Sequence, residues 1–447
     1  MRKNLFIILI IFYNSVLTEN ISIIGCGYVG LTMIGILTKC KHKVIGFDIN
    51  KNIISSLQEN IINIYEPGLD ELLFNNKNIN FTTNINEVIG SKIIYICVPT
   101  PSNIDGSCDL SFLFKAFKNI LDLCNNDEYK IICIKSTVPP GTLSQLQDLI
   151  IKNDKLNISL VYNPEFMREG SAINDVCTTN PIILGGEPET TQKILDLYKL
   201  FMSNQTKVIQ TNFESAEIIK YAWNSFSAIR ISYINELALL CKAFKANIFK
   251  VIQGFSLSED LLPTNVIKPG PGWGGSCFPK DTLSFSHILE KQGFTNSIVH
   301  AAIDSNENHK KIIIKNILES FSDDFLGEKQ VALLGLSFKA NTNDIRNAPS
   351  IDIIKALLNN NIKINAYDPK ANDNMKTIFP SINYYDNPYD AVKNVDSIVI
   401  LTEWQEIKNL DLKKIASLCK KKFLLDFRNC FNPLELKKHG FNYSNMG

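Results

Sequence analysis

Apolar and polar positions change rhythm along the chain and divide it into three main regions. From Ile21 onward, short apolar runs of strand length alternate with segments in which apolar residues recur every three or four positions. That alternation predicts parallel strands joined by helices. From Phe213 to about Phe244 the chain then runs for a long helical stretch without Pro or Gly, and the strand–helix rhythm restarts near residue 330. The pattern predicts an α/β protein with two Rossmann-like, doubly wound lobes joined by a long central helix and a helical middle domain.

The expected boundaries follow from this change of rhythm. They separate an apolar extension, a first lobe, a central helical domain and a second lobe, at residues 1–19, 20–212, 213–322 and 323–447. The extension contains a short apolar run, Leu5–Tyr13, behind two basic residues. This run resembles the apolar part of a signal peptide and is too short to span a bilayer. We expect an untargeted extension or a misassigned start, with a signal or membrane anchor as the alternative.

The composition mainly argues against certain classes of protein and kinds of site. The 447 residues are 45% hydrophobic and 20% charged, as in ordinary globular proteins. A net charge of +1 gives no electrostatic reason to expect nucleic-acid binding. Eleven scattered cysteines include no CxxC pair, and the five histidines lack ligand spacing, so we expect neither a disulfide framework nor a metal site. This use of cysteine favours a reducing, cytoplasmic compartment.

The first strand runs into a glycine turn that is suited to a dinucleotide. The turn GCGYVG follows the apolar run ISII and precedes the apolar segment LTMIGILTK. Its three glycines allow a tight turn, a close approach of backbone to a pyrophosphate, and packing of the helix on the strand. The next strand, KVIGFD, ends in a carboxylate that can bind the adenosine ribose and repel a 2′-phosphate. We therefore predict NAD as the cofactor, with a glycine turn that binds no ligand as the alternative. The residues expected to bind it are Gly25, Gly27, Tyr28, Val29, Gly30 and Asp48.

Polar residues follow three later strands of the first lobe. Thr100, Thr137 and Glu165 each come after an apolar run. Ligands in open α/β sheets bind at the carboxyl ends of the strands, so these side chains are site candidates. Ordinary turn chemistry at strand ends is the alternative. The loop after the third strand carries Arg168 and Glu169, which should face the same crevice.

The stretch GGSCFPKD, residues 274–281, carries the strongest candidate chemistry. Cys277 stands just before a segment that reads as an amphipathic helix, with Pro279 in its first turn. A helix N-terminus and the neighbouring Lys280 favour a thiolate, and Asp281 can reach back from one turn further on. A thiolate beside a carboxylate indicates covalent catalysis. A buried structural cysteine is the alternative.

Two further pairs of polar residues are candidates. Lys220 and Asn224 share one face of the long helix, one turn after Glu217, and could stabilise an oxyanion if they do not simply face solvent. Lys339 and Arg346 lie at the first turn of the second lobe, where basic side chains suit phosphates. Solvated surface charge is the alternative for that pair.

Taken together, the motifs resemble those of the UDP-glucose/GDP-mannose dehydrogenase family. The resemblance extends from Ile21 to about Asn432. It is carried, in order, by GCGYVG, YEPGLDELL, CVPTP, KSTVPPGT, NPEFMREG, the helix with Lys220 and Asn224, PGPGWGGSCFPKD and GLSFKANTNDIRNAPS.

The resemblance implies an NAD-dependent, four-electron oxidation of a nucleotide-sugar primary alcohol to a carboxylate, with two NAD⁺ and one water. Cys277 would be the nucleophile that forms a thiohemiacetal and then a thioester. The resemblance also implies a homodimer or a higher homo-oligomer, with the long helix as its core. The other catalytic residues would be Lys220 and Asn224 at the oxyanion, Asp281 and Glu165 in proton transfer, and Thr137 near the water and cofactor.

Binding residues are implied in the same way. Thr100, Thr137, Lys280 and Arg346 would join the NAD site. The UDP-sugar would contact Phe166, Met167, Arg168, Glu169, Gly170, Lys220, Asn224, Val266, Ile267, Lys268, Pro269, Gly270, Gly274 and Lys339.

One departure leaves the sugar open. Family members usually carry an R-I-G segment whose arginine reaches the substrate site of a neighbouring subunit, but Leu261-Leu262-Pro263 stands there in this chain. The nucleophile loop resembles the UDP-glucose branch, while GDP-mannose and UDP-N-acetylmannosamine remain alternatives. A two-electron hydroxyacid dehydrogenase, which would need neither Cys277 nor a second lobe, and an inactive nucleotide-sugar-binding scaffold are more distant alternatives.

Overall fold

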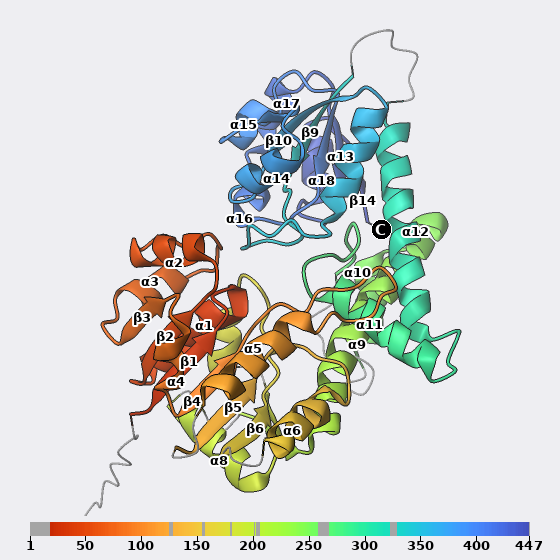
Figure 1. The fold of residues 1–447 in the computed structure, drawn as a ribbon. Coiled ribbons are helices and arrows are strands. Elements are labelled where there is room, and N and C mark those ends of the chain that lie inside the picture. Colours follow the sequence, from red (N-terminus) through yellow and green to blue (C-terminus); the bar gives the residue numbers. More distant parts are fainter. Residues whose placement is uncertain are drawn as a thin grey trace, which may run out of the picture.

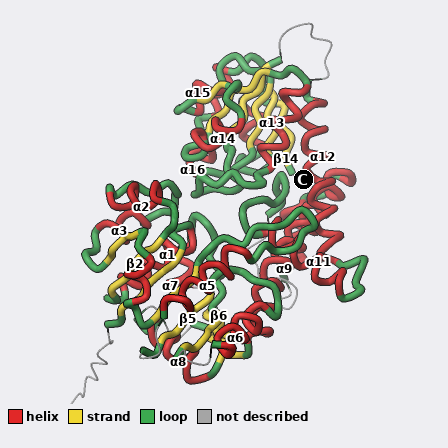
Figure 2. Tube along the Cα trace, in the orientation of Figure 1, coloured by secondary structure: helices red, strands yellow, loops and turns green. Residues whose placement is uncertain are grey.

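The computed structural model places two α/β lobes at opposite ends of the molecule, with long helices along one side (Figure 1). In each lobe the strands lie inside and helices cover them (Figure 2). The structure describes residues 18–124, 128–153, 157–178, 181–200, 202, 206–257, 268–321 and 329–446. Most of the apolar extension, the segment Leu261-Leu262-Pro263, and the expected substrate contacts Val266 and Ile267 lie outside the described residues. Among the described helices, none has both the length and the apolar character needed to cross a membrane.

The first lobe is built on one sheet with the strand order β3-β2-β1-β4-β5-β6-β7-β8. Its strands are β1 Asn20–Ile24, β2 Lys43–Phe47, β3 Ile79–Thr82, β4 Ile93–Ile96, β5 Lys130–Ile134, β6 Ile158–Tyr162, β7 Ile182–Gly186 and β8 Val208–Thr211. Neighbours are parallel except β6 and β7. The first six places have the order of a dinucleotide-binding sheet, as the sequence pattern predicted.

Strands β4 and β5 are buried along their whole length, as their unbroken apolar runs require. Such runs occur where helices cover both faces of a parallel sheet. Each fully buried Ile or Leu there contributes roughly 1.5–3 kcal/mol. The helices of this lobe are α1 Tyr28–Lys39, α2 Lys51–Gln58, α3 Leu69–Phe74, α4 Ile85–Ile89, α5 Ser111–Leu123, α6 Thr142–Lys152, α7 Ala172–Thr178 and α8 Pro188–Leu197.

The central helix α9 spans Phe213–Phe244, the range that the absence of Pro and Gly predicted. The Asn212 side chain caps its first turn by accepting from the amide of Ser215, and Lys245 ends it in the left-handed conformation. Between the cysteine loop and Phe321 the chain forms two helices, α11 and α12. The other central helices are α10 Ile248–Phe255, α11 Phe278–Lys291 and α12 Ile298–Glu319.

The second lobe repeats the order of the first in the sheet β11-β10-β9-β12-β13-β14. Its strands are β9 Gln330–Leu334, β10 Lys363–Tyr367, β11 Asn383–Tyr384, β12 Ser397–Ile400, β13 Phe423–Asp426 and β14 Asn442–Asn445. Its helices are α13 Pro349–Asn359, α14 Asn372–Ile378, α15 Pro388–Ala391, α16 Gln405–Lys408, α17 Leu412–Leu418 and α18 Pro433–Lys438. A long loop, rather than a tight glycine turn, separates β9 from α13. This loop points toward the first lobe (Figure 1).

Candidate active site

In the glycine turn after β1, two glycines are tightly packed and the third, Gly27, faces open space. A Cβ on Gly25, which has φ +98°, would lie 2.6 Å from the carbonyl oxygen of Cys97, and a Cβ on Gly30 would overlap the carbonyl oxygen of Gly25. A Cβ on Gly27 would meet no atom within 4 Å. Two glycines therefore permit close packing of the turn, and the third leaves free space in front of the α1 N-terminus. That arrangement fits the pyrophosphate of a dinucleotide.

Asp48 stands directly after β2, beside the turn. Its Oδ2 accepts from the Cys26 amide at 2.9 Å and its Oδ1 from the Asn50 amide at 2.9 Å. These bonds fix the carboxylate where the adenosine ribose of a dinucleotide would lie. The remaining residues expected at the cofactor, Tyr28 and Val29, open helix α1.

The candidate catalytic side chains come from three separate elements and lie together. Glu165 follows β6, Lys220 lies on α9, and Cys277 is the N-cap residue of α11. Lys220 Nζ donates to the backbone oxygen of Glu165 at 2.5 Å and to its Oε1 at 3.0 Å. Burial lowers the pKa of Lys220, but the carboxylates of Glu165 and Asp281 outweigh burial, so the net pKa is raised. The lysine is therefore a fixed positive charge beside the thiol.

Asp281, in the first turn of α11, is 1% exposed and binds two neighbours. Asn224 Nδ2 donates to its Oδ2 at 2.5 Å, and Lys280 Nζ lies 2.5 Å from its Oδ1. Asn224 is thus held against the first turn of α11 by Asp281. Lys280 was expected to contact the cofactor, but in this structure it forms an ion pair with Asp281.

The acid–base state of Cys277 differs from the expectation of a favoured thiolate. Burial raises the pKa of its thiol to about 11, and the carboxylates of Glu165 and Asp281 raise it as well. Lys220 and the Ser276 hydroxyl lower it by less. Desolvation and two carboxylates therefore outweigh the helix N-terminus, and the resting side chain is a thiol.

The two threonines at strand ends are coupled through backbone. Thr100 Oγ1 donates to the carbonyl oxygen of Thr137 at 2.8 Å, and Thr100 is 5% exposed. This bond joins the ends of β4 and β5 on the side of the sheet where ligands bind. Thr100 therefore positions the Thr137 loop.

The loop from Phe166 to Gly170 lies between the two lobes. The ring of Phe166 packs edge-on against Trp223 of α9, and the Met167 amide donates to Glu165 Oε2 at 2.7 Å. The guanidinium of Arg168 forms a two-point pair with Asp175 at 2.9 and 2.6 Å. Arg168 therefore holds the loop on α7, and its own side chain is already paired.

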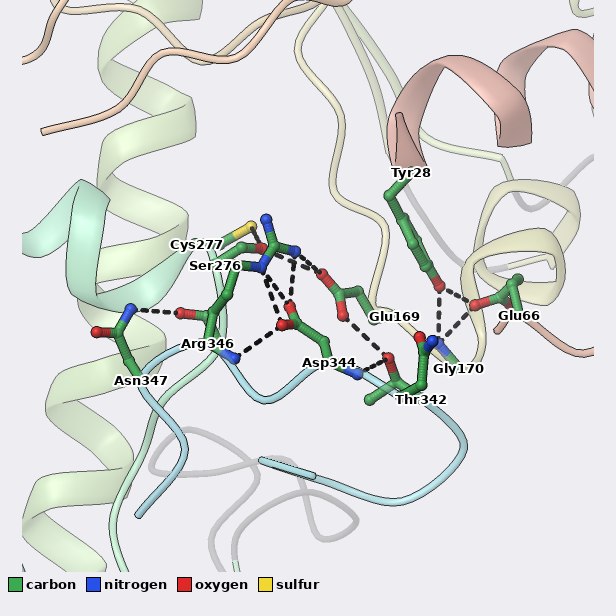
Figure 3. A network of polar contacts seen from close by, with 12 residues as sticks. Tyr28, Glu66, Glu169, Gly170, Ser276, Cys277, Thr342, Asp344, Arg346 and Asn347 are labelled. Atoms are coloured by element: carbon green, nitrogen blue, oxygen red, sulfur yellow. Dashed lines mark hydrogen bonds and ion pairs between the residues drawn. The ribbon is translucent and has the colours of Figure 1, made fainter. Parts of the chain in front are cut away.

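Glu169 is the centre of a polar network between the lobes (Figure 3). It accepts from Ser276 Oγ at 3.0 Å and from Thr342 Oγ1 at 3.2 Å, and Arg346 lies 3.4 Å from it. Arg346 also pairs with Asp344 at 2.6 Å. The network joins the first lobe, the nucleophile loop and the second lobe next to the thiol, because Ser276 Oγ is 3.5 Å from the sulfur of Cys277.

The remaining expected substrate residues that the structure describes are Lys268, Pro269, Gly270, Gly274 and Lys339. The Gly270 amide donates to Asn235 Oδ1 at 2.9 Å, and a Cβ on Gly274 would lie 2.2 Å from the carbonyl oxygen of Asn347. Lys268 is exposed and Pro269 is buried. Burial lowers the pKa of Lys339, which faces Glu169 and other charged groups of the first lobe.

Sequence reasoning missed part of this interface. The sequence predicted no role for Ser276, Thr342 and Asp344, although all three lie in the family motifs. It also predicted no role for Glu66 in YEPGLDELL. Glu66 is 5% exposed and binds Tyr28 and Gly170. A buried carboxylate in a motif is a signal, but its partners are more than 35 residues away in the sequence and only the fold reveals them.

A dinucleotide lobe, a second lobe of the same topology and a thiol between them define a class, the NAD-dependent dehydrogenases that act on nucleotide sugars. Three family models match the chain: the NAD binding domain at residues 19–202, the central domain at 214–308 and the UDP binding domain at 332–433 of the UDP-glucose/GDP-mannose dehydrogenases. The chain belongs to the UDP-glucose/GDP-mannose dehydrogenase family.

Relatives match it over nearly its whole length. The UDP-glucose 6-dehydrogenase TuaD of Bacillus subtilis (strain 168) is 37% identical over 436 residues, covering 96% of this chain and 93% of its own. The UDP-glucose 6-dehydrogenase of Rickettsia conorii is 38% identical, covering 96% and 99%. Among solved structures, the UDP-glucose dehydrogenase of Pyrobaculum islandicum has a TM-score of 0.85 at 28% identity, covering 97% and 98%. The UDP-N-acetyl-mannosamine dehydrogenase Cap5O of Staphylococcus aureus has a TM-score of 0.77 at 26% identity, covering 96% and 98%.

Proposed function

We propose that this chain oxidises UDP-glucose to UDP-glucuronate in two NAD⁺-dependent steps, as a UDP-glucose 6-dehydrogenase. The observation that carries the proposal is the thiol of Cys277, which lies among Lys220, Glu165 and Asp281 at the meeting point of both lobes. An alcohol dehydrogenase that stops at the aldehyde has no use for a nucleophile there. The relatives named UDP-glucose 6-dehydrogenase favour UDP-glucose over GDP-mannose and UDP-N-acetylmannosamine.

The thiol explains how one site performs two oxidations. Bound NAD⁺ would supply the hydride acceptor each time. The C6 alcohol loses a hydride and a proton and becomes an aldehyde. Cys277 gives its proton to a neighbouring carboxylate as its sulfur adds to the aldehyde carbon, and protonation of the resulting oxyanion gives a thiohemiacetal. Loss of a second hydride and proton leaves a thioester, and water cleaves it to the carboxylate and the free thiol. The covalent bond keeps the intermediate bound and aligned.

The neighbouring residues have roles that match their positions. The ammonium of Lys220 and the amide of Asn224 stabilise the oxygen that becomes negative when sulfur attacks. Because the resting group is a thiol, it needs a proton acceptor at that moment, and Asp281 and Glu165 are the carboxylates beside it. Thr137 helps to hold the water and cofactor.

The proposed binding surfaces divide between the lobes. The first lobe, residues 20–212, would hold NAD through the glycine turn, Asp48 and Thr100, with Lys280 and Arg346 added from the other domains. The second lobe, residues 323–447, would hold the UDP-sugar with Lys339 and the 166–170 loop, and the central domain, 213–322, would add the cysteine loop. Lys280 and Arg346 would have to exchange carboxylate partners for a ligand, because both are paired here.

Homodimer formation through α9 is a further part of the proposal. From Trp223 to the end of this helix, exposed apolar residues recur at alternating steps of three and four or their sum, which is the spacing of a coiled-coil seam. They are Trp223, Phe226, Tyr233, Leu240 and Phe244. Within the seam, Arg230 Nε and one of its terminal nitrogens are buried and have no hydrogen-bond partner in the described part of the chain. A second copy of α9 would cover the stripe. We also propose a cytoplasmic location, since the many scattered cysteines suit a reducing compartment.

The test is the yield of NADH at completion with limiting UDP-glucose, compared with GDP-mannose and UDP-N-acetylmannosamine. We expect two NADH per UDP-glucose and little turnover of the other sugars. Cys277→Ser should abolish release of the acid. One NADH per sugar would contradict the thioester route, and turnover of another sugar alone would overturn the choice of substrate.

A further inference from the structure

Glu66 is a buried carboxylate that the proposed chemistry does not use. It lies in the loop before α3 and is 5% exposed. Its Oε2 accepts from the Gly170 amide at 2.5 Å and its Oε1 from the Ala172 amide at 2.8 Å. The Tyr28 hydroxyl also donates to Oε2, and the same hydroxyl accepts from the Gly170 amide at 2.8 Å. Figure 3 shows Tyr28, Glu66 and Gly170 as one closed group of polar contacts.

The partners of Glu66 belong to two different binding surfaces. Tyr28 is the first residue of α1 and follows Gly27, the open glycine of the dinucleotide turn. Gly170 ends the loop expected to hold the nucleotide sugar, next to Glu169 and its network. One carboxylate therefore contacts both the cofactor turn and the substrate loop.

The loop that carries Glu66 also contacts the second lobe. The Tyr65 amide donates to Asn343 Oδ1 at 3.1 Å, and Asn343 Nδ2 donates to the carbonyl oxygen of Asn63 at 3.3 Å. Gly170 has φ +78°, and a Cβ there would lie 2.5 Å from the carbonyl oxygen of Asn341. Cofactor turn, substrate loop and second lobe thus meet around one side chain.

We propose that Glu66 is a positioning residue that couples the two ligand sites, so that a dinucleotide on the glycine turn and a nucleoside diphosphate sugar on the 166–170 loop each raise the affinity for the other. A dinucleotide that fixes Tyr28 also fixes the hydroxyl to which Glu66 and Gly170 bind. The substrate loop is then already ordered when the sugar arrives, and the second ligand loses less conformational entropy. This inference rests on the proposed function, because it takes NAD and UDP-glucose as the two ligands.

A purely structural role makes a different prediction. Ala172 is the first residue of α7, so Glu66 also caps that helix. If capping were its whole role, replacing Glu66 would lower the stability of the fold. It would also lower the affinity for each ligand by the same factor, whether or not the other ligand is bound. Only coupling between the sites changes the ratio of affinities measured with and without the second ligand.

The experiment is calorimetric titration of UDP-glucose into the full-length protein with and without saturating NADH, which cannot be reduced further and so permits no turnover. For the unaltered protein we expect NADH to raise the affinity for UDP-glucose by about five-fold or more. In Glu66→Gln the amide cannot accept from both amide groups and the Tyr28 hydroxyl, so the ratio should fall close to one. Titrating NADH with and without UDP-glucose must give the same ratio.

Tyr28→Phe is the second variant, and it keeps the test decisive if Glu66→Gln does not fold. It removes one hydroxyl and should lower the ratio by at least half, and the double variant should give the same ratio as Glu66→Gln alone. Glu59→Gln, an exposed carboxylate at the end of α2, is the matched control and should keep the full ratio. An unchanged ratio in Tyr28→Phe or in a folded Glu66→Gln, or a ratio of one in the unaltered protein, would overturn the inference. Absence of any UDP-glucose binding by the unaltered protein would overturn the proposed function and this inference with it.

Discussion

At the scale of single residues, burial and the neighbouring charges together set the pKa of the Cys277 thiol. Its thiol has a pKa of about 11 because of desolvation and the nearby carboxylates of Glu165 and Asp281. Lys220 lowers this pKa but does not reverse the shift. A resting thiol resists oxidation and stray electrophiles, while a carbonyl substrate can be attacked as the proton moves to a carboxylate.

This state predicts the pH dependence of alkylation. Below its pKa, the thiolate fraction of Cys277 rises about ten-fold per pH unit, whereas that of an unperturbed thiol rises only about three-fold between pH 8 and 9. The rate of iodoacetamide labelling, followed by mass spectrometry of the peptide that contains Cys277, should show the steeper rise. Lys220→Met should slow labelling at every pH, because it removes the positive charge that lowers the pKa.

A short unstructured cysteine peptide in the same solution is the control for the reagent, and it should follow the shallower curve. A shallow curve for Cys277 would contradict the raised pKa and would restore the thiolate that the helix N-terminus alone suggests. The local motif does not predict this difference, because the shift depends first on burial in the folded protein and then on Glu165, which follows β6, as well as on Asp281. The glycines and Asp48 were easier to predict, because their roles depend on backbone within one strand–turn–helix unit.

At the scale of elements, α9 and α6 are joined by a carboxylate. Glu217 of α9 is buried, and it accepts from the amides of Gly141 and Leu143 at 2.7 and 2.8 Å at the N-terminus of α6. One turn later α9 carries Lys220. The bonds therefore fix the distance between the loop after β5, which contains Thr137, and the oxyanion residues.

Glu217 makes stability depend on pH. Burial raises its pKa from 4.5 to about 7, although the two amides lower it. The folded protein therefore keeps this proton up to about pH 7, while the unfolded chain loses it near pH 4.5, so the contribution to stability is full below pH 4.5 and is lost as pH rises through 7. Glu217→Gln, which has no proton to lose, should flatten the fall in melting temperature between pH 5 and pH 8 by a few degrees.

Glu214→Gln is the matched control one turn earlier on α9. The Ser144 hydroxyl lowers the pKa of Glu214, so its own titration lies below pH 4.5. Its charge also helps to raise the pKa of Glu217, but less than burial does, so its replacement should change the slope between pH 5 and 8 much less than Glu217→Gln does. Equal slopes for Glu217→Gln and the unaltered protein would show that this carboxyl titrates normally. Differential scanning fluorimetry across the pH range suffices.

The elements themselves could be predicted well where one physical rule dominates. The bounds of α9 follow from a cap at Asn212 and the absence of Pro and Gly, and the buried strands follow from unbroken apolar runs. In the loop between β9 and α13 the sequence predicted Lys339 and Arg346 as site candidates, but it gave no role to Thr342 and Asp344. Thr342 looks like part of a polar surface turn, and only the approach of Glu169 from the other lobe explains it.

At the scale of the whole molecule, the exposed seam of α9 is the feature that a single chain leaves uncovered. Phe226 and Leu240 are 60% and 55% exposed on it. Each apolar side chain of this size is worth roughly 1.5–3 kcal/mol when it is fully buried, so a stripe of five can hold two copies together. The seam faces away from the sheets and runs beside the catalytic residues, since Trp223 contacts Phe166. Pairing would therefore also support the substrate loop.

Charge in the seam should separate the copies. Phe226→Asp with Leu240→Glu places two carboxylates where each copy of α9 would bury apolar surface against the other, and desolvating them opposes association. We expect light scattering after gel filtration to give the mass of two chains for the unaltered protein and of one chain for the double variant. Leu434→Glu, which replaces a still more exposed leucine on α18 in the second lobe, is the control and should leave the mass unchanged. A double variant that keeps the larger mass would place the interface elsewhere, and an unaltered protein with the mass of one chain would refute the dimer.

The activity of a monomeric double variant then measures what the second copy contributes, because Trp223 and Phe166 would lose support while every catalytic residue stays in place.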